Sequence, residues 1–148
     1  MELLQNIGLG LQVAVSPENL LLCFIGVLLG TLIGVLPGIG AVATMAMLLP
    51  ITFHLAPVTS LIMRAGIYYG AQYGGSTTAI LVNLPGEANS VVTALDGYAM
   101  ARKGRAGAAL AIAAIASFFA GTVATVLIAM FGPTMAKLAL NFGPVEHF

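Results

Sequence analysis

Charged residues are scarce in this sequence. Five lysines and arginines and five acidic residues occur among 148, so 7% of the chain is charged while 59% is hydrophobic. A soluble domain carries about a quarter charged residues, because its surface has to remain hydrated. So few charges cannot cover a globular surface, which excludes an ordinary soluble domain. The net charge of zero and the lack of an extended basic patch also exclude nucleic acid as a partner.

Cysteine and catalytic combinations of residues are equally scarce. Cys23 is the single cysteine and lies in an apolar run, so an intrachain disulfide is excluded and a packed, unreactive thiol is favoured. His54 and His147 lie far apart, with no cysteine or carboxylate at metal-ligand spacing. Glu87 and Asp96 do not share a helix face, and no serine–histidine pair occurs at motif spacing. The sequence therefore predicts no enzyme, no metal site and no resident cofactor.

Apolar sequence, by contrast, is abundant and uninterrupted. No aspartate, glutamate, lysine or arginine occurs at positions 19–63 or at 106–136. About 20 apolar residues cross a bilayer core of roughly 30 Å, and both runs exceed that length. The first residues lack the basic segment of a secretory signal peptide. We therefore expect an all-α protein, a polytopic transmembrane helical bundle with broken helices.

Proline, glycine and charge divide the chain into segments of a single transmembrane domain over 1–148. The expected segments are an interfacial lead-in at 1–19, a broken helix or hairpin at 20–54, a helix at 58–73, a re-entrant hairpin at 76–101 and a transmembrane helix at 106–131 that ends at Gly132-Pro133. The second segment is too long for one comfortable crossing and too short for two, which is why a break is expected within it.

Small residues recur every four positions in three segments. The stripes are Gly26, Gly30, Gly34 and Gly38, then Gly66, Gly70 and Gly74, and later Ala109, Ala113, Ser117, Gly121 and Thr125. Residues four apart share a helix face, and small ones let helix backbones approach closely where lipid provides no hydrophobic drive to associate. The stripes predict helix–helix contacts.

Two Leu-Pro-Gly breaks, at 36–40 and 83–87, interrupt apolar segments. Non-helical backbone at membrane depth persists only where protein or a water-filled cavity covers it. Transporters use such breaks to aim helix N-termini at anionic substrates and free carbonyl groups at cations. The alternative, an ordinary loop at the membrane surface, stays open for both breaks.

Polar residues surround the second break, which favours a binding role there. Ser76 and Thr77 precede it, and Asn89 and Ser90 follow it. If the chain bends at Gly74-Gly75, the eight residues 76–83 rise only about 12 Å as a helix, well under half of the bilayer core. Such an arm cannot cross the membrane alone. We therefore expect a re-entrant hairpin whose tip lies near the membrane midplane.

Few charges lie within or beside the apolar segments, and ionisable residues at such positions are usually functional. Arg64 can instead extend its guanidinium to the interface, and Glu87 can instead cap the helix that follows it. Arg102, Lys103 and Arg105 form a short basic turn, and such turns stay in the cytoplasm.

The motif GVLPGIG at 34–40 and the stretch YGAQYGGSTTAILVNLPGEANSVVTALDGYAMARKGRAG at 69–107 resemble the large membrane subunit of the tripartite tricarboxylate transporter family. The resemblance runs from about Leu20 onward and corresponds to the N-terminal portion of that subunit. It implies a permease of the bacterial inner membrane that works with a small membrane subunit and a periplasmic substrate-binding protein. It also implies that an ion gradient, of Na⁺ or H⁺, drives the uptake of tricarboxylates or other carboxylates.

Carried over residue by residue, the resemblance and the physical argument give ten candidate substrate-binding residues. They are Pro37, Gly38 and Gly40 at the first break, Asn83, Pro85 and Gly86 at the second, and Ser76, Thr77, Asn89 and Ser90 around it. The alternative function is a non-transporting membrane module that packs or assembles helices. A pure packing module has no need for polar groups to converge on a bend, and this distinguishes the two hypotheses.

Overall fold

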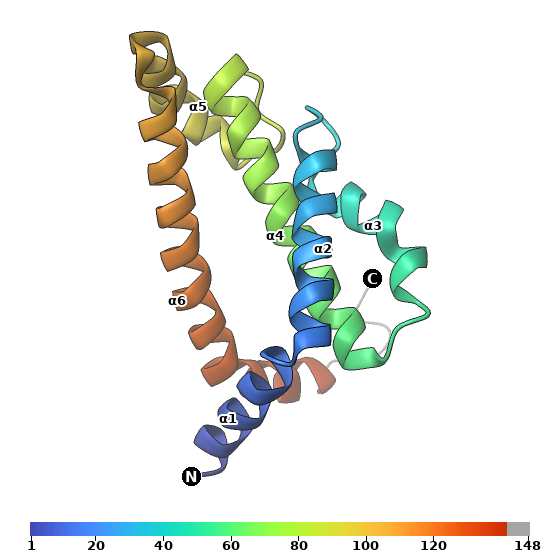
Figure 1. Ribbon diagram of the computed structural model, residues 1–148. Coiled ribbons are helices and arrows are strands. Elements are labelled where there is room, and N and C mark those ends of the chain that lie inside the picture. The colour runs from blue at the N-terminus through green and yellow to red at the C-terminus, as the bar shows by residue number, and fades with distance from the viewer. Residues whose placement is uncertain (142–148) are drawn as a thin grey trace.

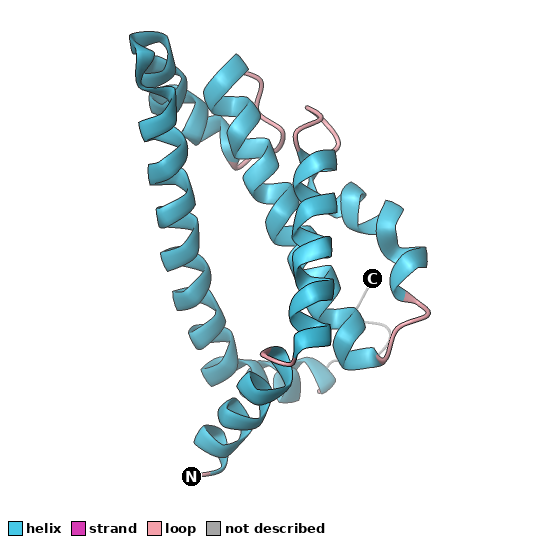
Figure 2. Cartoon of the chain, in the orientation of Figure 1, coloured by secondary structure: helices cyan, strands magenta, loops and turns pink. Residues whose placement is uncertain are grey.

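The computed structural model describes residues 1–141, and every regular element in this part of the chain is helical. In chain order the elements are α1 (Glu2–Ala14), α2 (Pro17–Gly34), α3 (Gly40–Thr52), α4 (Pro57–Val82), α5 (Ser90–Met100), η1 (Ala101–Arg105) and α6 (Ala106–Leu140). Short loops join them (Figure 2). The expected all-α class is confirmed. His147 lies outside the described residues.

Two helical stretches, Pro17–Gly34 and Ser90–Leu140, are long and apolar enough to cross a membrane. α2 and α4 begin at Pro17 and Pro57, where a missing backbone N–H costs nothing because the first turn of a helix has no partner for it. The 18 residues of α2 rise about 27 Å, close to the thickness of a bilayer core. The number of crossings stays a prediction.

The core of the structure is the contact between α2 and α4, which run side by side in the same direction (Figure 1). A Cβ atom added to Gly30 would lie 2.2 Å from the carbonyl oxygen of Ile67, and one added to Gly70 would lie 2.2 Å from that of Val27. No side chain fits at either position. The glycine stripes of α2 and α4 are therefore helix contacts, as the sequence predicts. Gly38 lies outside this contact, in the loop after α2, with a φ of 91°.

The expected break at Gly74 and Gly75 is wrong. α4 is continuous through both residues, so the helix expected at 58–73 and the arm expected at 76–83 form one helix of 26 residues, about 39 Å long. Both glycines are buried, and a Cβ on Gly74 would lie 2.6 Å from the carbonyl oxygen of Thr31. Packing against α2 thus outweighs the weak helix propensity of glycine. The short arm was the reason to expect a re-entrant tip at the midplane, and that reason no longer holds.

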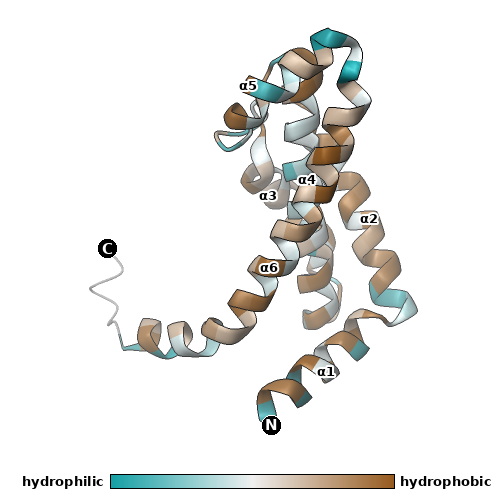
Figure 3. Cartoon of the chain, turned by 90° about the vertical axis from the view of Figure 1, so that its left-hand side faces the viewer, coloured by the Kyte–Doolittle hydropathy of each residue, from teal (hydrophilic) through white to brown (hydrophobic). Residues whose placement is uncertain are grey.

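The expected end of the last helix at Gly132-Pro133 is also wrong. α6 continues to Leu140 with Pro133 inside it, and Figure 3 shows that it bends toward its C-terminal end. Proline in a helix interior commonly causes such a bend. Most of α6 is exposed and apolar, and it touches α4 where Tyr69 Oη donates a hydrogen bond to the Ser117 carbonyl oxygen, 3.1 Å away.

Candidate functional site at the two Pro-Gly loops

The two Pro-Gly breaks lie against each other in space. The loop 35–39 joins α2 to α3, and the loop 83–89 joins α4 to α5. The backbone N–H of Ala41 donates a hydrogen bond to the carboxylate of Glu87, and the Thr78 hydroxyl donates one to the Val35 carbonyl oxygen, 3.0 Å away. We call these two loops, together with the first turn of α3, the loop junction.

The loop 83–89 reaches α3 because it folds back along α4. Asn83 ends α4 in the left-handed conformation, with a φ of 58°, which is a common way for a helix to stop. Gly86 then packs on Gly75, where an added Cβ would lie 2.6 Å from the Gly75 Cα atom and 3.3 Å from the Gly34 carbonyl oxygen. This contact requires glycine at position 86, whereas a Cβ on Gly75 would lie 3.4 Å from the Gly86 Cα, an ordinary contact distance. The contact places the next residue, Glu87, beside α3.

The loop 35–39 reverses the chain so that α3 runs back along α2 and α4. Gly38 and Gly40 have φ values of 91° and 71°, a backbone conformation that residues other than glycine rarely adopt. α3 begins at Gly40, whose carbonyl oxygen accepts a hydrogen bond of 2.8 Å from the buried Thr44 hydroxyl. In the first turn of α3 the N–H of Ala41 faces the loop junction, where Glu87 accepts its hydrogen bond.

Charges of opposite sign lie at the two ends of α3. Glu87 accepts the Ala41 N–H at the N-terminal end, while Arg64 Nε donates to Thr52 Oγ1, 2.9 Å away, at the C-terminal end. The N-terminus of a helix carries a partial positive charge and the C-terminus a partial negative one. Both side chains therefore stabilise this helix of 13 residues electrostatically. The interpretation that Glu87 caps the helix after it is wrong, because its carboxylate goes to α3.

The structure brings some of the expected site residues together at the loop junction. Gly40 and Gly86 form it with Glu87, and Ser90 is buried beside them. Ser90 Oγ lies 3.1 Å from the Glu87 N–H nitrogen and 2.8 Å from its carbonyl oxygen. This short bridge holds the turn that positions the Glu87 carboxylate.

The other expected residues line the edge of the loop junction or lie on α4. Pro37, Gly38, Asn83 and Asn89 are exposed, and Pro85 is half-buried. The hydroxyls of Ser76 and Thr77 donate within α4, to the carbonyl oxygens of Gln72 and Tyr73 at 3.2 and 2.9 Å. These two hydroxyls thus have only acceptor capacity left for a ligand.

The sequence argument left Glu87, Ala41 and Thr78 out of the set of expected site residues. Glu87 could have been identified from the sequence, since it is an ionisable residue directly after Pro-Gly in apolar sequence. Ala41 and Thr78 carry no such signal. Their roles arise from backbone and hydroxyl groups that only the fold brings to this place.

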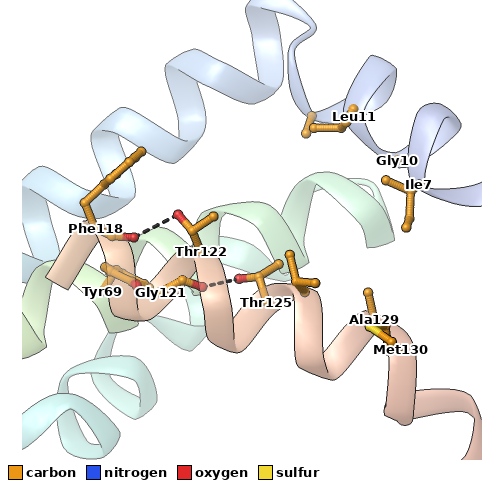
Figure 4. A pocket seen from close by; sticks show the side chains of 12 residues that line it. Ile7, Gly10, Leu11, Tyr69, Phe118, Gly121, Thr122, Thr125, Ala129 and Met130 are labelled. Atoms are coloured by element: carbon orange, nitrogen blue, oxygen red, sulfur yellow. Dashed lines mark hydrogen bonds between the residues drawn. The ribbon is translucent and has the colours of Figure 1, made fainter. Parts of the chain in front are cut away.

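A larger apolar cavity lies elsewhere, between α1, α4 and α6, with a volume of about 650 Å³ (Figure 4). Its lining contains no charged residue. Thr122 and Thr125 reach it, but their hydroxyls donate to the carbonyl oxygens of Phe118 and Gly121 in the preceding turn. Such an apolar groove offers nothing to recognise a carboxylate, so size alone does not identify the site.

Comparison with known proteins identifies the family of the chain. An uncharacterised 52.8 kDa protein from the TAR-I ttuC' 3' region of Agrobacterium vitis is 68% identical over all 148 residues, and the chain spans 30% of the length of that relative. No solved structure matches the chain. The family model described as "Tripartite tricarboxylate transporter TctA family" matches residues 20–148, a stretch that contains the whole loop junction. The chain belongs to the tripartite tricarboxylate transporter TctA family.

Proposed function

We propose that the chain is the N-terminal part of the permease subunit of a secondary transporter for tricarboxylates or other carboxylates. In this proposal the permease lies in the bacterial inner membrane and crosses it several times. It works with a small membrane subunit and a periplasmic substrate-binding protein, and a gradient of Na⁺ or H⁺ drives uptake. Membership of the TctA family and the apolar helices support this assignment.

The loop junction is the observation that carries the proposal. Two breaks that a packing role does not require meet at one place, and an N-terminal N–H group of α3 already holds a carboxylate there, that of Glu87. Free N–H groups at a helix N-terminus favour anions. The exposed amides of Asn83 and Asn89 lie on the same loop and can donate further hydrogen bonds.

We assign substrate contact to the expected residues on these two loops. The set comprises Pro37, Gly38, Gly40, Asn83, Pro85, Gly86, Asn89 and Ser90, with the oxygens of Ser76 and Thr77 on the adjoining helix. In this assignment the glycines and prolines shape the backbone, the asparagines supply donors, and Ser90, whose hydroxyl already donates to the Glu87 carbonyl oxygen, holds the turn. A substrate carboxylate and the Glu87 carboxylate then compete for the same few hydrogen-bond donors.

The alternative function, a helix-packing module, has one observation in its favour. The glycine contact between α2 and α4 is continuous and explains Gly26, Gly30, Gly66 and Gly70 without any ligand. It does not explain why Glu87, on the loop 83–89, accepts a hydrogen bond from the first turn of α3. The two functions therefore differ in whether a carboxylate contacts the loop junction.

Thiol labelling tests this difference. Gly86 itself is unsuitable, because an added side chain would collide with Gly75. Ala88 is exposed on the same loop, so we use A88C in a C23S background, in the full-length protein reconstituted in vesicles. Citrate is expected to slow the reaction of A88C with a maleimide, because bound substrate covers the loop.

G104C is the matched control. Gly104 lies in the turn between α5 and α6 with a φ of 77°, so a cysteine strains this exposed turn, but a Cβ added there would meet nothing within 4 Å. Citrate should leave its labelling rate unchanged. Equal labelling of A88C with and without citrate, in vesicles that take up citrate, would rule out the loop junction as the substrate site. Failure of these vesicles to take up citrate when the small membrane subunit, the binding protein and an ion gradient are supplied would favour the packing module.

A further inference from the structure

A second polar pocket lies at the other end of α3 from the loop junction. It has a volume of about 310 Å³ and is lined by Thr52, Phe53, Leu55, Pro57, Ser60, Leu61 and Arg64. The residues come from the end of α3, the connection to α4 and the first two turns of α4. We call it the Arg64 pocket. Its volume is near the lower limit for sites that bind small molecules.

The guanidinium of Arg64 has a fixed orientation in this pocket. Nε donates to Thr52 Oγ1 at 2.9 Å, and Thr52 in turn donates to the Leu49 carbonyl oxygen at 2.8 Å. The guanidinium carbon lies 5.8 Å from the centre of the Phe53 ring, within the range of a cation–π contact. Among residues 1–141 this is the one side-chain hydrogen bond that Arg64 makes. Four of its five N–H donors stay available on the side of the pocket.

Ser60 adds a second available donor. The residue is only 6% exposed and lines the pocket, yet its hydroxyl forms no hydrogen bond with any other described residue. Among residues 1–141 no buried side-chain oxygen or nitrogen lacks a hydrogen-bond partner, so the Ser60 Oγ is open to the pocket, where water or a ligand can pair with it. Arg64 and Ser60 are four residues apart in α4 and therefore share a helix face. Together they present several donors, one of them cationic, to a single small cavity.

We propose that Arg64 and Ser60 bind a carboxylate group of the transported substrate, at a site separate from the loop junction. Guanidinium forms two parallel hydrogen bonds with a carboxylate, and an ammonium group cannot reproduce that geometry. The inference rests on the proposed function for its substrate class. If the basic turn at Arg105 faces the cytoplasm, the pocket lies toward the outer side of the membrane, because α4 runs in the opposite direction to α6 (Figure 1). The Arg64 pocket is then the first contact of an incoming carboxylate.

Labelling at Leu61 tests this assignment. Leu61 lines the pocket and is 64% exposed, so L61C in a C23S background reports on the occupancy of the pocket. In the full-length protein in vesicles, citrate should slow the reaction of L61C with a maleimide, and trimethyl citrate, which lacks the charges, should not. R64Q should raise the citrate concentration needed for protection by about tenfold or more, because a charge-assisted bidentate contact is lost. R64K keeps the charge but not the bidentate geometry, so the citrate concentration needed for protection should lie between those of R64Q and the unchanged protein.

Arg64 also stabilises the end of α3, so R64Q can impair folding. S60A is the second variant, since Ser60 has no such contact, and it should weaken the protection of L61C several-fold at an unchanged melting temperature. Protection that is unchanged in both R64K and S60A would overturn the inference. A88C is followed in parallel. If citrate protects A88C but not L61C, the Arg64 pocket is not a carboxylate site and the proposed function stands. If citrate protects neither residue in vesicles that take up citrate, neither the Arg64 pocket nor the loop junction is a substrate site.

Discussion

Glu87 forms a contact with Ala41, a residue 46 positions away in the sequence. The carboxylate accepts a backbone N–H at the start of α3, and the turn that presents it is bridged by Ser90. A single side chain thereby joins the two Pro-Gly loops. We expect removal of the Glu87 side chain to loosen the loop junction before it affects the α2–α4 contact. The reason is that this side chain forms no hydrogen bond with α2 or α4.

Substitution of Glu87 tests this role. E87Q keeps an acceptor for the Ala41 N–H and loses only the charge at the N-terminus of α3, so we expect a loss of about 0.3–1 kcal/mol in the free energy of unfolding. E87A leaves the partly buried N–H of Ala41 without a hydrogen-bond partner and should lower the free energy of unfolding by about 1–3 kcal/mol. Denaturant titration in mild detergent measures both. E2Q, in the exposed first turn of α1, is the control: it removes a charge at a helix N-terminus but no hydrogen bond, so its loss should match that of E87Q and stay below that of E87A. Equal stability of E87A and E2Q would show that the contact contributes nothing.

At the scale of elements, the contact between α2 and α4 depends on glycine. The helices approach so closely that carbonyl oxygens of one occupy the space of a Cβ on the other, at Gly30 and at Gly70. A short loop and the 13 residues of α3 then return the chain so that α4 can run parallel to α2. The close contact therefore requires both the glycines and the break between α2 and α3.

Leucine at either glycine should push the helices apart. We expect G30L and G70L each to destabilise the protein by on the order of 1–3 kcal/mol, as at other overpacked sites. Thermal unfolding in detergent measures the loss. G107L, at a glycine whose added Cβ would meet nothing within 4 Å, is the matched control. Melting temperatures of G30L and G70L that equal that of G107L would contradict the close contact.

At the scale of the whole molecule, the basic turn gives an orientation to all the helices. The segment η1, which contains Arg102, Lys103 and Arg105, lies at one end of the molecule, and the N-terminal ends of α2 and α4 lie at the other (Figure 1). Short basic loops stay in the cytoplasm. On that rule α2 and α4 run inward and α6 runs outward.

Cysteine accessibility checks this orientation. G104C should resist an impermeant thiol reagent in intact cells and react after permeabilisation. V58C, exposed at the opposite end of the molecule, should react in intact cells. Both variants use the C23S background. The opposite pattern, with G104C labelled and V58C protected in intact cells, would invert the orientation and place the Arg64 pocket on the cytoplasmic side.

The sequence by itself determined that the chain is surrounded by lipid and that its regular elements are helices. With so few charges and such long apolar runs, the backbone has to satisfy its own hydrogen bonds, and a chain in lipid does so by forming helices. The four-residue spacing of Gly26, Gly30 and Gly34 likewise predicted a contact face, because that spacing is a local property of a helix. Proline fixed the break at Pro37 for the same local reason.

The tertiary structure alone decided where helices continue and which loops meet. Gly74, Gly75 and Pro133 resemble breaks when local propensity is considered, yet α4 and α6 pass through them. In α4 this happens because packing against α2 outweighs propensity. The meeting of Glu87 with Ala41 depends on the contact between Gly86 and Gly75. No local pattern encodes such a pairing, because it arises only when two distant backbones approach within van der Waals distance.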